Sequence, residues 1–109
     1  MSMWADYKME REGKSVLEED GGFAVFSYPN PHEVWIEDIY VVAEERKSGL
    51  ARALADAICA EAKEKGCQRV LGSVWDTANG ATASIKVLLA YGMHFSHLEG
   101  KLLVFKKEI

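Results

Sequence analysis

Two short stretches of this sequence contain residue types suited to binding an anion or to transferring a proton. The first, Arg46-Lys47-Ser48-Gly49-Leu50-Ala51, stands between a β-favouring run and an alanine-rich helical pattern. Glycine lets backbone amides approach a ligand closely, and the first amides of a helix lack intrahelical acceptors and carry partial positive charge. Such a corner can hold an anion, above all a phosphate. The structural alternative is a basic loop in which Ser48 caps the helix.

The second stretch is the acidic pair Glu37-Asp38, inside the run VWIEDIYVV. A carboxylate can act as general base and take the proton of an ammonium, often through a water molecule, so that the neutral amine can attack. Strict strand alternation puts the two side chains on opposite faces of a sheet. At most one of them then reaches a given side directly. The alternative is that both are solvated charges or salt-bridge partners.

The elements that must position these stretches follow from the hydrophobic pattern. Leu50, Leu54 and Ile58 recur four residues apart and predict a helix over 49–65. Residues 6–20 alternate around a glycine and predict a hairpin, and residues 21–28 predict a strand that the proline-containing stretch 29–32 ends. Further strands are predicted over 34–42, 68–75, 93–98 and 101–107, and a second helix over 82–91. This order predicts an α+β (mixed α/β) fold.

Length, charge and residue composition limit the kinds of protein and partner that this sequence allows. The length of 109 residues predicts a single domain over 1–109. A net charge of -4 argues against nucleic acid or an anionic membrane surface as partner, since both are bound by basic patches. The first residues lack the apolar core of a secretory signal, and the two cysteines predict reduced thiols. We therefore expect a cytoplasmic protein. The three histidines show no metal-ligand spacing, so no metal site is expected.

The pattern Arg-x-x-Gly-x-Ala at residues 46–51, directly after Val-Val-Ala-Glu-Glu, resembles the acetyl-CoA motif of the GNAT N-acetyltransferases. The stretch WIEDIYVVAEERKSGLA resembles the polyamine-type members of that family, and SVWDTANGATASIKVLLAYGM and EGKLLVFKKE resemble the elements that follow. The resemblance covers residues 34–108. It implies a central mixed sheet flanked by two helices, acetyl-CoA as cosubstrate, and direct acetyl transfer to a primary amine of a small molecule or a protein.

The resemblance also implies roles for individual residues. Glu37 matches the general base of polyamine-type enzymes, and Asp38 then lies near the acceptor. A backbone amide at the end of the same strand would polarise the thioester carbonyl. Asn79 would bind the pantetheine arm, although a turn residue in Ala78-Asn79-Gly80 is the equal alternative. The residues implied to bind acetyl-CoA are Tyr40, Val41, Val42, Arg46, Lys47, Ser48, Gly49, Leu50, Ala51 and Asn79.

Two departures from the family pattern leave alternatives open. The 30 residues before Pro31 are predicted as strands, so the N-terminal helices that wall the family's acceptor site are reduced or absent. The acceptor site is then either open or completed by the second subunit of a homodimer. The tyrosine that protonates the leaving thiolate in many members is replaced by Leu88, and Tyr91 is rotated from that direction by about 60°. The alternative functions are a catalytically degenerate GNAT-fold module that binds CoA or a protein, and a small interaction protein without CoA.

Overall fold

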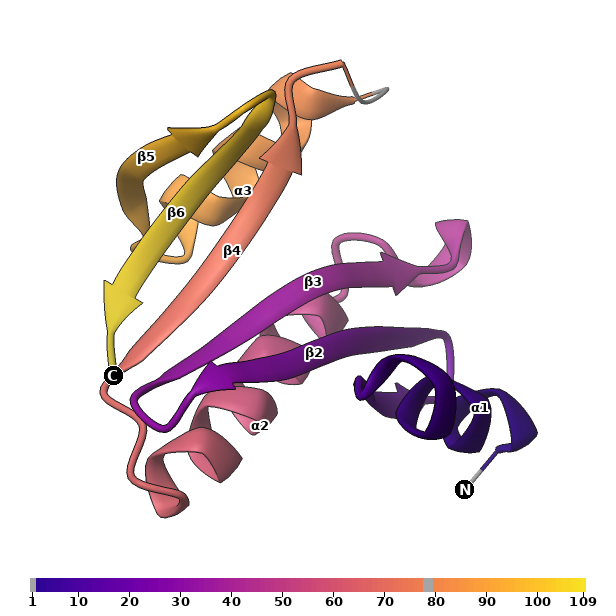
Figure 1. Ribbon diagram of the computed structural model, residues 1–109. Helices are drawn as coiled ribbons and strands as arrows, with labels where there is room; N and C mark the ends of the chain where they lie inside the picture. Colours follow the sequence, from indigo (N-terminus) through magenta and orange to yellow (C-terminus); the bar gives the residue numbers. More distant parts are fainter. Residues whose placement is uncertain (1, 78–79) are drawn as a thin grey trace.

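Within residues 2–77 and 80–109, which a computed structural model describes, six strands form one mixed sheet in the order β1-β2-β3-β4-β6-β5 (Figure 1). β3 and β4 are parallel, and the other neighbouring strands are antiparallel. The elements in chain order are α1 (Met3–Glu12), β1 (Ser15–Glu19), β2 (Gly22–Asn30), β3 (Glu33–Val41), the 3-10 turn η1 (Ala43–Glu45), α2 (Leu50–Glu64), β4 (Arg69–Trp75), α3 (Ala81–Ala90), β5 (His94–Glu99) and β6 (Leu102–Glu108). The expected α+β (mixed α/β) fold is confirmed.

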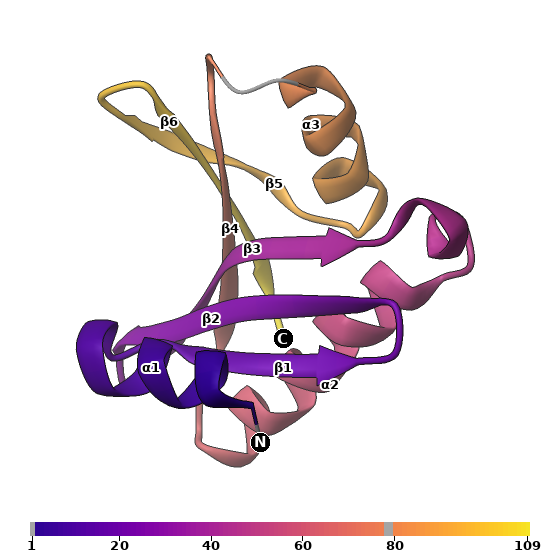
Figure 2. The same cartoon turned by 90° about the vertical axis from the view of Figure 1, so that its right-hand side faces the viewer.

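The core lies between the sheet and one layer of helices. Leu54 and Ile58 of α2 are each 1% exposed and pack with Val34 of β3 and Val70 of β4, both 0% exposed. Leu88 of α3 packs against the same cluster, so α2 and α3 cover the same face of the sheet. Figure 2 shows α3 and the first turn of α2 on one side of the strands and α1 on the other. The predicted helix over 49–65 therefore forms because its apolar residues, four apart, all reach this core.

Replacing Leu54 with alanine is expected to lower the free energy of unfolding by about 3 kcal/mol, because a cavity remains where a fully enclosed side chain stood. Leu89 of α3 is a matched control, since its side chain is 52% exposed, and Leu89→Ala should cost less than about 1 kcal/mol. Urea unfolding followed by circular dichroism measures both values. Equal losses in the two variants would contradict the assignment of the core to the α2 face.

The predicted hairpin over residues 6–20 is wrong in its first half, which forms helix α1. Ser2 precedes the helix and its Oγ accepts a hydrogen bond from the amide of Ala5 at 3.0 Å. Gly13 ends the helix with a left-handed φ of 68°, and its amide bonds back to Met9. These two caps stabilise a helix in a stretch where the alternation of polar and apolar side chains predicted a strand. A helix thus lies before the first strand, and the N-terminal helical part is reduced to the ten residues of α1.

α1 packs on the face of the sheet that α2 leaves uncovered. Trp4 meets Phe23 of β2 edge to face, with ring centroids 4.6 Å apart, and Phe23 in turn lies 5.6 Å from the ring of Tyr40 on β3. This aromatic row fixes α1 across β2 and β3, a type of contact worth about 1 kcal/mol for each ring pair. Among the described residues, none of the helices has the length and apolarity needed to cross a membrane.

Strand β2 continues past the point where the prolines were expected to end it. It includes Pro29 and Asn30, and its register with β3 shifts between Ser27 and Asn30. A proline cannot donate to a strand ladder but is tolerated where the ladder is interrupted. The turn between β2 and β3 therefore lies at Pro31-His32, two residues later than expected.

Candidate active site

Strands β3 and β4 pair only over one half of their length. Glu33 to Ile36 lie in register with Arg69 to Gly72, and beyond these residues the two strands diverge (Figure 1). β3 leads through η1 to the N-terminus of α2, and β4 leads towards the N-terminus of α3. The space between the unpaired halves of these two strands, which we call the divergence of β3 and β4, therefore opens towards the starts of two helices.

The closed end of the divergence is held by polar contacts between the strands. Arg69 Nε of β4 donates to Glu33 Oε2 of β3 at 3.0 Å, and Asn30 Nδ2 donates to Glu33 Oε1 at 2.7 Å. The hydrogen bonds from Asn30 and then from Arg69 hold the pKa of Glu33 below its usual value. One step further, Trp35 Nε1 donates to Ser73 Oγ at 2.9 Å. These contacts fix where the two strands part.

Glu33→Gln is expected to lower the free energy of unfolding by about 1 kcal/mol at pH 7. The folded-state pKa of Glu33 is depressed, so its charge stabilises the protein fully above the pKa of an unfolded glutamate, about 4.3. That stabilisation is lost as the pH falls through the lower folded-state pKa. Urea unfolding at pH 7 and at pH 3 should show a difference that shrinks at the lower pH. The exposed Glu10→Gln is the control, and a pH-independent cost of Glu33→Gln would contradict this account.

The loop before α2 has the backbone geometry of an anion site. Lys47 and Gly49 both adopt left-handed conformations, with φ of 72° and 90°, and a Cβ on Gly49 would meet nothing within 4 Å. Ser48 Oγ accepts weakly from the amide of Leu50 at 3.3 Å. Within the described residues, the amides of Ala51 and Arg52 have no acceptor, as expected for the first turn of a helix. The open side of this turn can therefore receive an anionic ligand.

The side chains of the loop take different positions. Arg46 Nε donates to the carbonyl of Val41 at 3.0 Å and so ties the loop to the end of β3. Lys47 is exposed. Gly49 occupies the N-cap position of α2, and no side chain caps the helix by a hydrogen bond there. Ser48 bonds both to Leu50 and to the carbonyl of Glu45, which shapes the turn. Asn79, the residue expected to bind the pantetheine arm, lies outside the described residues.

The backbone of β3 presents alternate amides to the divergence. The amide of Val42 donates to Gly21 at 2.8 Å, and Val41 pairs with Gly22 and Tyr40 with Phe23. Because hydrogen bonding alternates along an antiparallel strand, the amide of Tyr40 also faces β2. Those of Ile39 and Val41 point the other way, into the divergence. The sequence did not predict a role for the Ile39 amide, because only the pairing of β3 with β2 identifies which amides of β3 point into the divergence.

Glu37 and Asp38 share one face of the sheet, so the expectation that they point to opposite faces is wrong. Asp38 pairs with Val25 while Ile36 pairs with Phe26, which leaves Glu37 as an extra residue in a β-bulge. A bulge shifts the side-chain alternation of a strand by one residue. The shift is visible in the core, where Ile36 and Ile39, of opposite parity, pack against the same cluster. Both carboxylates are thereby brought to the face covered by α1.

The carboxylate of Glu37 already has two partners. Ser27 Oγ of β2 donates to Oε2 at 2.9 Å, and Lys14 Nζ lies 2.8 Å from Oε1. The side chain of Glu37 is 17% exposed and that of Lys14 is 30% exposed. The hydrogen bond to Glu37 raises the pKa of Lys14. Lys14 and Ser27 were not singled out from the sequence, since only the bulge and the turn after α1 bring them to Glu37.

Neither Leu88 nor Tyr91 offers a proton to the divergence of β3 and β4. Leu88 packs over Gly72, where a Cβ would lie 3.1 Å from its Cδ2, at the point where the strands part. Tyr91 donates its hydroxyl proton towards α2, to Asp56 and, at 3.7 Å, to Cys59 Sγ. Burial, together with these bonds, raises the pKa of Tyr91 well above its usual range. The hydroxyl of Tyr91 therefore links the end of α3 to α2 and does not point into the divergence.

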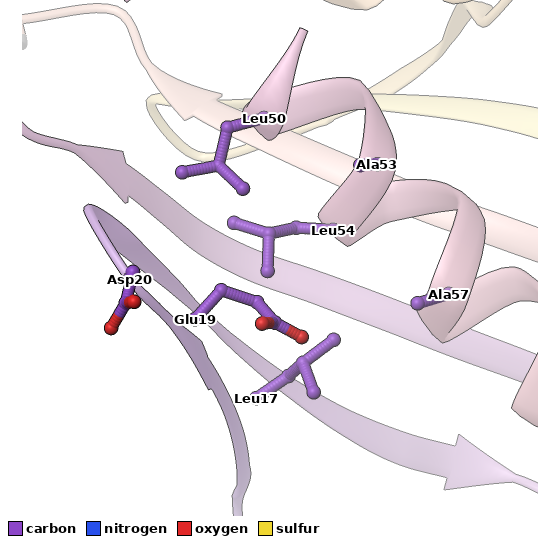
Figure 3. A pocket seen from close by; sticks show the side chains of 7 residues that line it. All are labelled: Leu17, Glu19, Asp20, Leu50, Ala53, Leu54 and Ala57. Atoms are coloured by element: carbon purple, nitrogen blue, oxygen red, sulfur yellow. The ribbon is translucent and has the colours of Figure 1, made fainter. Parts of the chain in front are cut away.

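Two hollows lie on opposite faces of the sheet. The first, of about 330 Å³, lies between β1 and α2, where Leu54 faces Leu17 and Glu19 and the side chain of Asp20 points away from the helix (Figure 3). The second, of about 590 Å³, lies on the α1 face. Its lining includes Trp4, Glu18, Glu19, Phe23 and Tyr40. Only the second shares the face of Glu37 and Asp38. Among the described residues, no group of three or more His, Cys, Asp or Glu side chains is placed to hold a metal ion.

The comparisons with known proteins agree with this geometry. A GNAT-family acetyltransferase from Elizabethkingia anophelis with acetyl-CoA bound superposes with a TM-score of 0.74 at 13% identity, covering 100% of this chain and 84% of the other. A Bacillus subtilis acetyltransferase in complex with CoA gives 0.72 at 15% identity, with coverages of 97% and 82%. The anti-CRISPR protein AcrVA5 gives 0.67 at 19% identity, with coverages of 84% and 96%, so a chain of similar length carries this fold.

These likenesses, all below 25% identity, establish the fold. A search of curated protein sequences finds no match. The sequence model of the acetyltransferase (GNAT) family matches residues 2–93, which include α1, the divergence of β3 and β4, the loop before α2, and α3. On that match, the chain belongs to the GNAT acetyltransferase family.

Proposed function

We propose that this protein is an acetyl-CoA-dependent N-acetyltransferase that transfers an acetyl group to a primary amine by direct attack. The observation that carries the proposal is the divergence of β3 and β4, which opens onto a helix start whose first amides are unpaired within the described residues. A nucleotide pyrophosphate fits such a helix start. An extended acyl-pantetheine chain fits between strand backbones whose amides are free to bond it. The neighbour from Elizabethkingia anophelis, with acetyl-CoA bound, supports this cosubstrate.

The pyrophosphate of acetyl-CoA is assigned to the loop before α2. Gly49 allows close approach, the amides of Ala51 and Arg52 donate, and the exposed Lys47 adds a full positive charge. Arg46 holds the loop to Val41. The thioester end then lies along β3, where the outward amides of Ile39 and Val41 can donate to the carbonyl oxygen. Donors that strengthen as that oxygen becomes negative stabilise the transition state by about 3 kcal/mol.

Glu37 is assigned as the general base and Asp38 as an acidic neighbour of the acceptor. The acceptor arrives as an ammonium, gives a proton to the Glu37 carboxylate, directly or through water, and attacks the thioester carbon. The new C–N bond forms, the nitrogen releases its second proton to solvent, the C–S bond breaks, and CoA leaves as a thiolate. Leu88 cannot protonate this thiolate, and Tyr91 is bound to α2, so we assign its protonation to solvent at the open divergence.

The acceptor is expected to approach on the α1 face. That face holds Glu37, Asp38 and the hollow lined by Trp4, Phe23 and Tyr40, with Glu18 and Glu19 in its wall. Aromatic faces and carboxylates both favour cations. A cationic acceptor, either a small amine or a lysine or N-terminus of a protein, fits these surroundings.

The proposal is tested by mixing the purified chain with acetyl-CoA and a panel of small amines and lysine peptides, and measuring CoA thiol release and product mass. Transfer to a defined amine at a rate well above that of the heat-unfolded protein supports it. Tight acetyl-CoA binding without transfer to any amine would favour the second candidate, a CoA-binding module that has lost its chemistry. The leucine at position 88 and the ion pair that occupies Glu37 favour that candidate.

A further inference from the structure

Strand β5 forms an edge of the sheet and carries exposed apolar side chains. Among the described strands it pairs with β6 alone, and Figure 1 shows it on the outer side of β6, away from β4. Phe95 is 48% exposed and Leu98 is 60% exposed. An edge strand has unpaired backbone groups that can bond another strand, and proteins often protect such edges with lysine or proline. The β5 sequence HFSHLE contains neither.

A β-bulge places both apolar side chains of β5 on one face of the sheet. Phe95 pairs with Phe105 and Leu98 with Leu103, and the register shift between these pairs leaves Ser96 as the extra residue. Phe105 and Leu103 are two residues apart on β6 and both pack with the core cluster under the helices. Phe95 and Leu98 therefore share the face that α3 covers. The bulge gathers the exposed apolar side chains and does not shield them.

The opposite face of β5 is polar. His94, His97 and Glu99 pair with the alternate residues of β6, whose side chains lie on that face. His97 Nε2 lies 3.0 Å from Glu99 Oε1. β5 therefore has a pair of apolar side chains on one face and hydrogen-bonding groups on the other.

The sequence of β5 is complementary to itself in antiparallel pairing. One register pairs all six residues of β5 with the six residues of a second copy. Across that interface it forms three kinds of pair: His94 with Glu99, Phe95 with Leu98, and Ser96 with His97. Residues directly opposite each other in such a pair share a face, as Phe95 and Leu98 do. A shift by one residue would place Phe95 opposite His97 or Glu99, whose side chains lie on the other face.

We infer that two copies of this chain associate through β5, which pairs with β5 of the second copy across a two-fold axis. The two six-stranded sheets then form one continuous sheet. Phe95 and Leu98 of both copies are removed from water together, and the His94 imidazole donates to Glu99 of the second copy. β4 and β6 separate this edge from β3. The inference therefore does not rest on the proposed function.

The other edge of the sheet, β1, is less suited to a second copy. Glu18 and Glu19 make up two of its five residues, and Asp20 follows them. Two copies paired along β1 would bring three carboxylates from each chain close together, and these would repel one another. The distribution of charge thus favours β5 over β1 as the edge that binds a second copy.

Sedimentation velocity of the full chain, from nanomolar to submillimolar concentration, tests the inference. The unaltered protein should reach the mass of two chains as the concentration rises. Leu98→Lys should weaken the dimer at least about 100-fold, because each copy would bury a charged group against apolar side chains. Leu98 is 60% exposed in one chain, so the fold should be retained. Met9→Lys is the matched control, since Met9 is 51% exposed and lies on α1, and it should leave the dimer unchanged.

A charge exchange tests the register and stays informative if Leu98→Lys does not fold. His94→Glu places two carboxylates opposite each other at both ends of the interface and should weaken the dimer about 10-fold. The double variant His94→Glu, Glu99→Lys places opposite charges in the same positions and should regain most of the affinity. A chain that stays monomeric throughout, or a dimer that Leu98→Lys leaves unchanged, would overturn the inference. A double variant no tighter than His94→Glu would overturn the register. Acetyl transfer by a monomeric chain would leave the proposed function standing.

Discussion

Glu37→Gln is expected to lower the rate of acetyl transfer to an external amine about 100-fold at saturating acetyl-CoA. The amide keeps the shape of the side chain and can still accept from Ser27 Oγ, which lies 2.9 Å from Glu37. It cannot take a proton from the acceptor. The dissociation constant of acetyl-CoA should change by less than about twofold, because the change removes a group that acts on the acceptor. Steady-state thiol release and calorimetric titration separate the two quantities.

Two further variants locate the effect of Glu37. Glu12→Gln also removes a carboxylate from Lys14, since Glu12 Oε1 lies 3.5 Å from Lys14 Nζ, but it leaves the carboxylate of Glu37 in place. It should therefore retain most of the turnover. Asp38→Asn tests the other member of the acidic pair, which the bulge brings to the same face. Full turnover in Glu37→Gln together with a large loss in Asp38→Asn would assign the base to Asp38.

Gly49→Glu is expected to weaken acetyl-CoA binding by about 100-fold or more, equivalent to about 3 kcal/mol. The new carboxylate would stand beside the first amides of α2 and repel the pyrophosphate that we place there. A Cβ on Gly49 meets nothing within 4 Å, so the substitution introduces charge without a steric clash inside the protein. Calorimetric titration with acetyl-CoA measures the change.

Two controls separate charge from backbone strain at this position. Gly49→Ala carries the cost of a side chain at a φ of 90° without the charge. Gly66→Glu makes the same substitution at the opposite end of α2, where φ is 91° and a Cβ likewise meets nothing within 4 Å. Both should bind acetyl-CoA far better than Gly49→Glu. Equal weakening by Gly66→Glu would show that lost stability, and not repulsion of the ligand, explains the result.

Much of the fold could be predicted because its signals are local. The helix over 49–65 shows in the spacing of Leu50, Leu54 and Ile58, and β3 shows in its run of β-favouring residues. Helix α1 was missed because it buries a single residue, Ala5, and depends on caps at Ser2 and Gly13. A helix with such a short apolar face has almost no periodicity, so alternating polar and apolar residues are easily mistaken for a strand.

The candidate site could be predicted only in part for a related reason. The loop at Arg46–Ala51 and the acidic pair at Glu37-Asp38 are contiguous in the sequence and show in residue type. The bulge at Glu37 depends on pairing with β2, which no single strand reveals. The same holds for the ion pair of Glu37 with Lys14, which joins residues on separate elements. Contacts of this kind follow from the tertiary fold and leave no local pattern.

Calorimetric titration of the purified protein with acetyl-CoA shows whether the divergence of β3 and β4 and the loop before α2 form a cosubstrate site. We expect saturable binding at one site per chain with micromolar affinity, which Gly49→Glu removes and Gly66→Glu retains. An absence of binding at millimolar acetyl-CoA, in protein that unfolds cooperatively, would show that these elements do not form such a site.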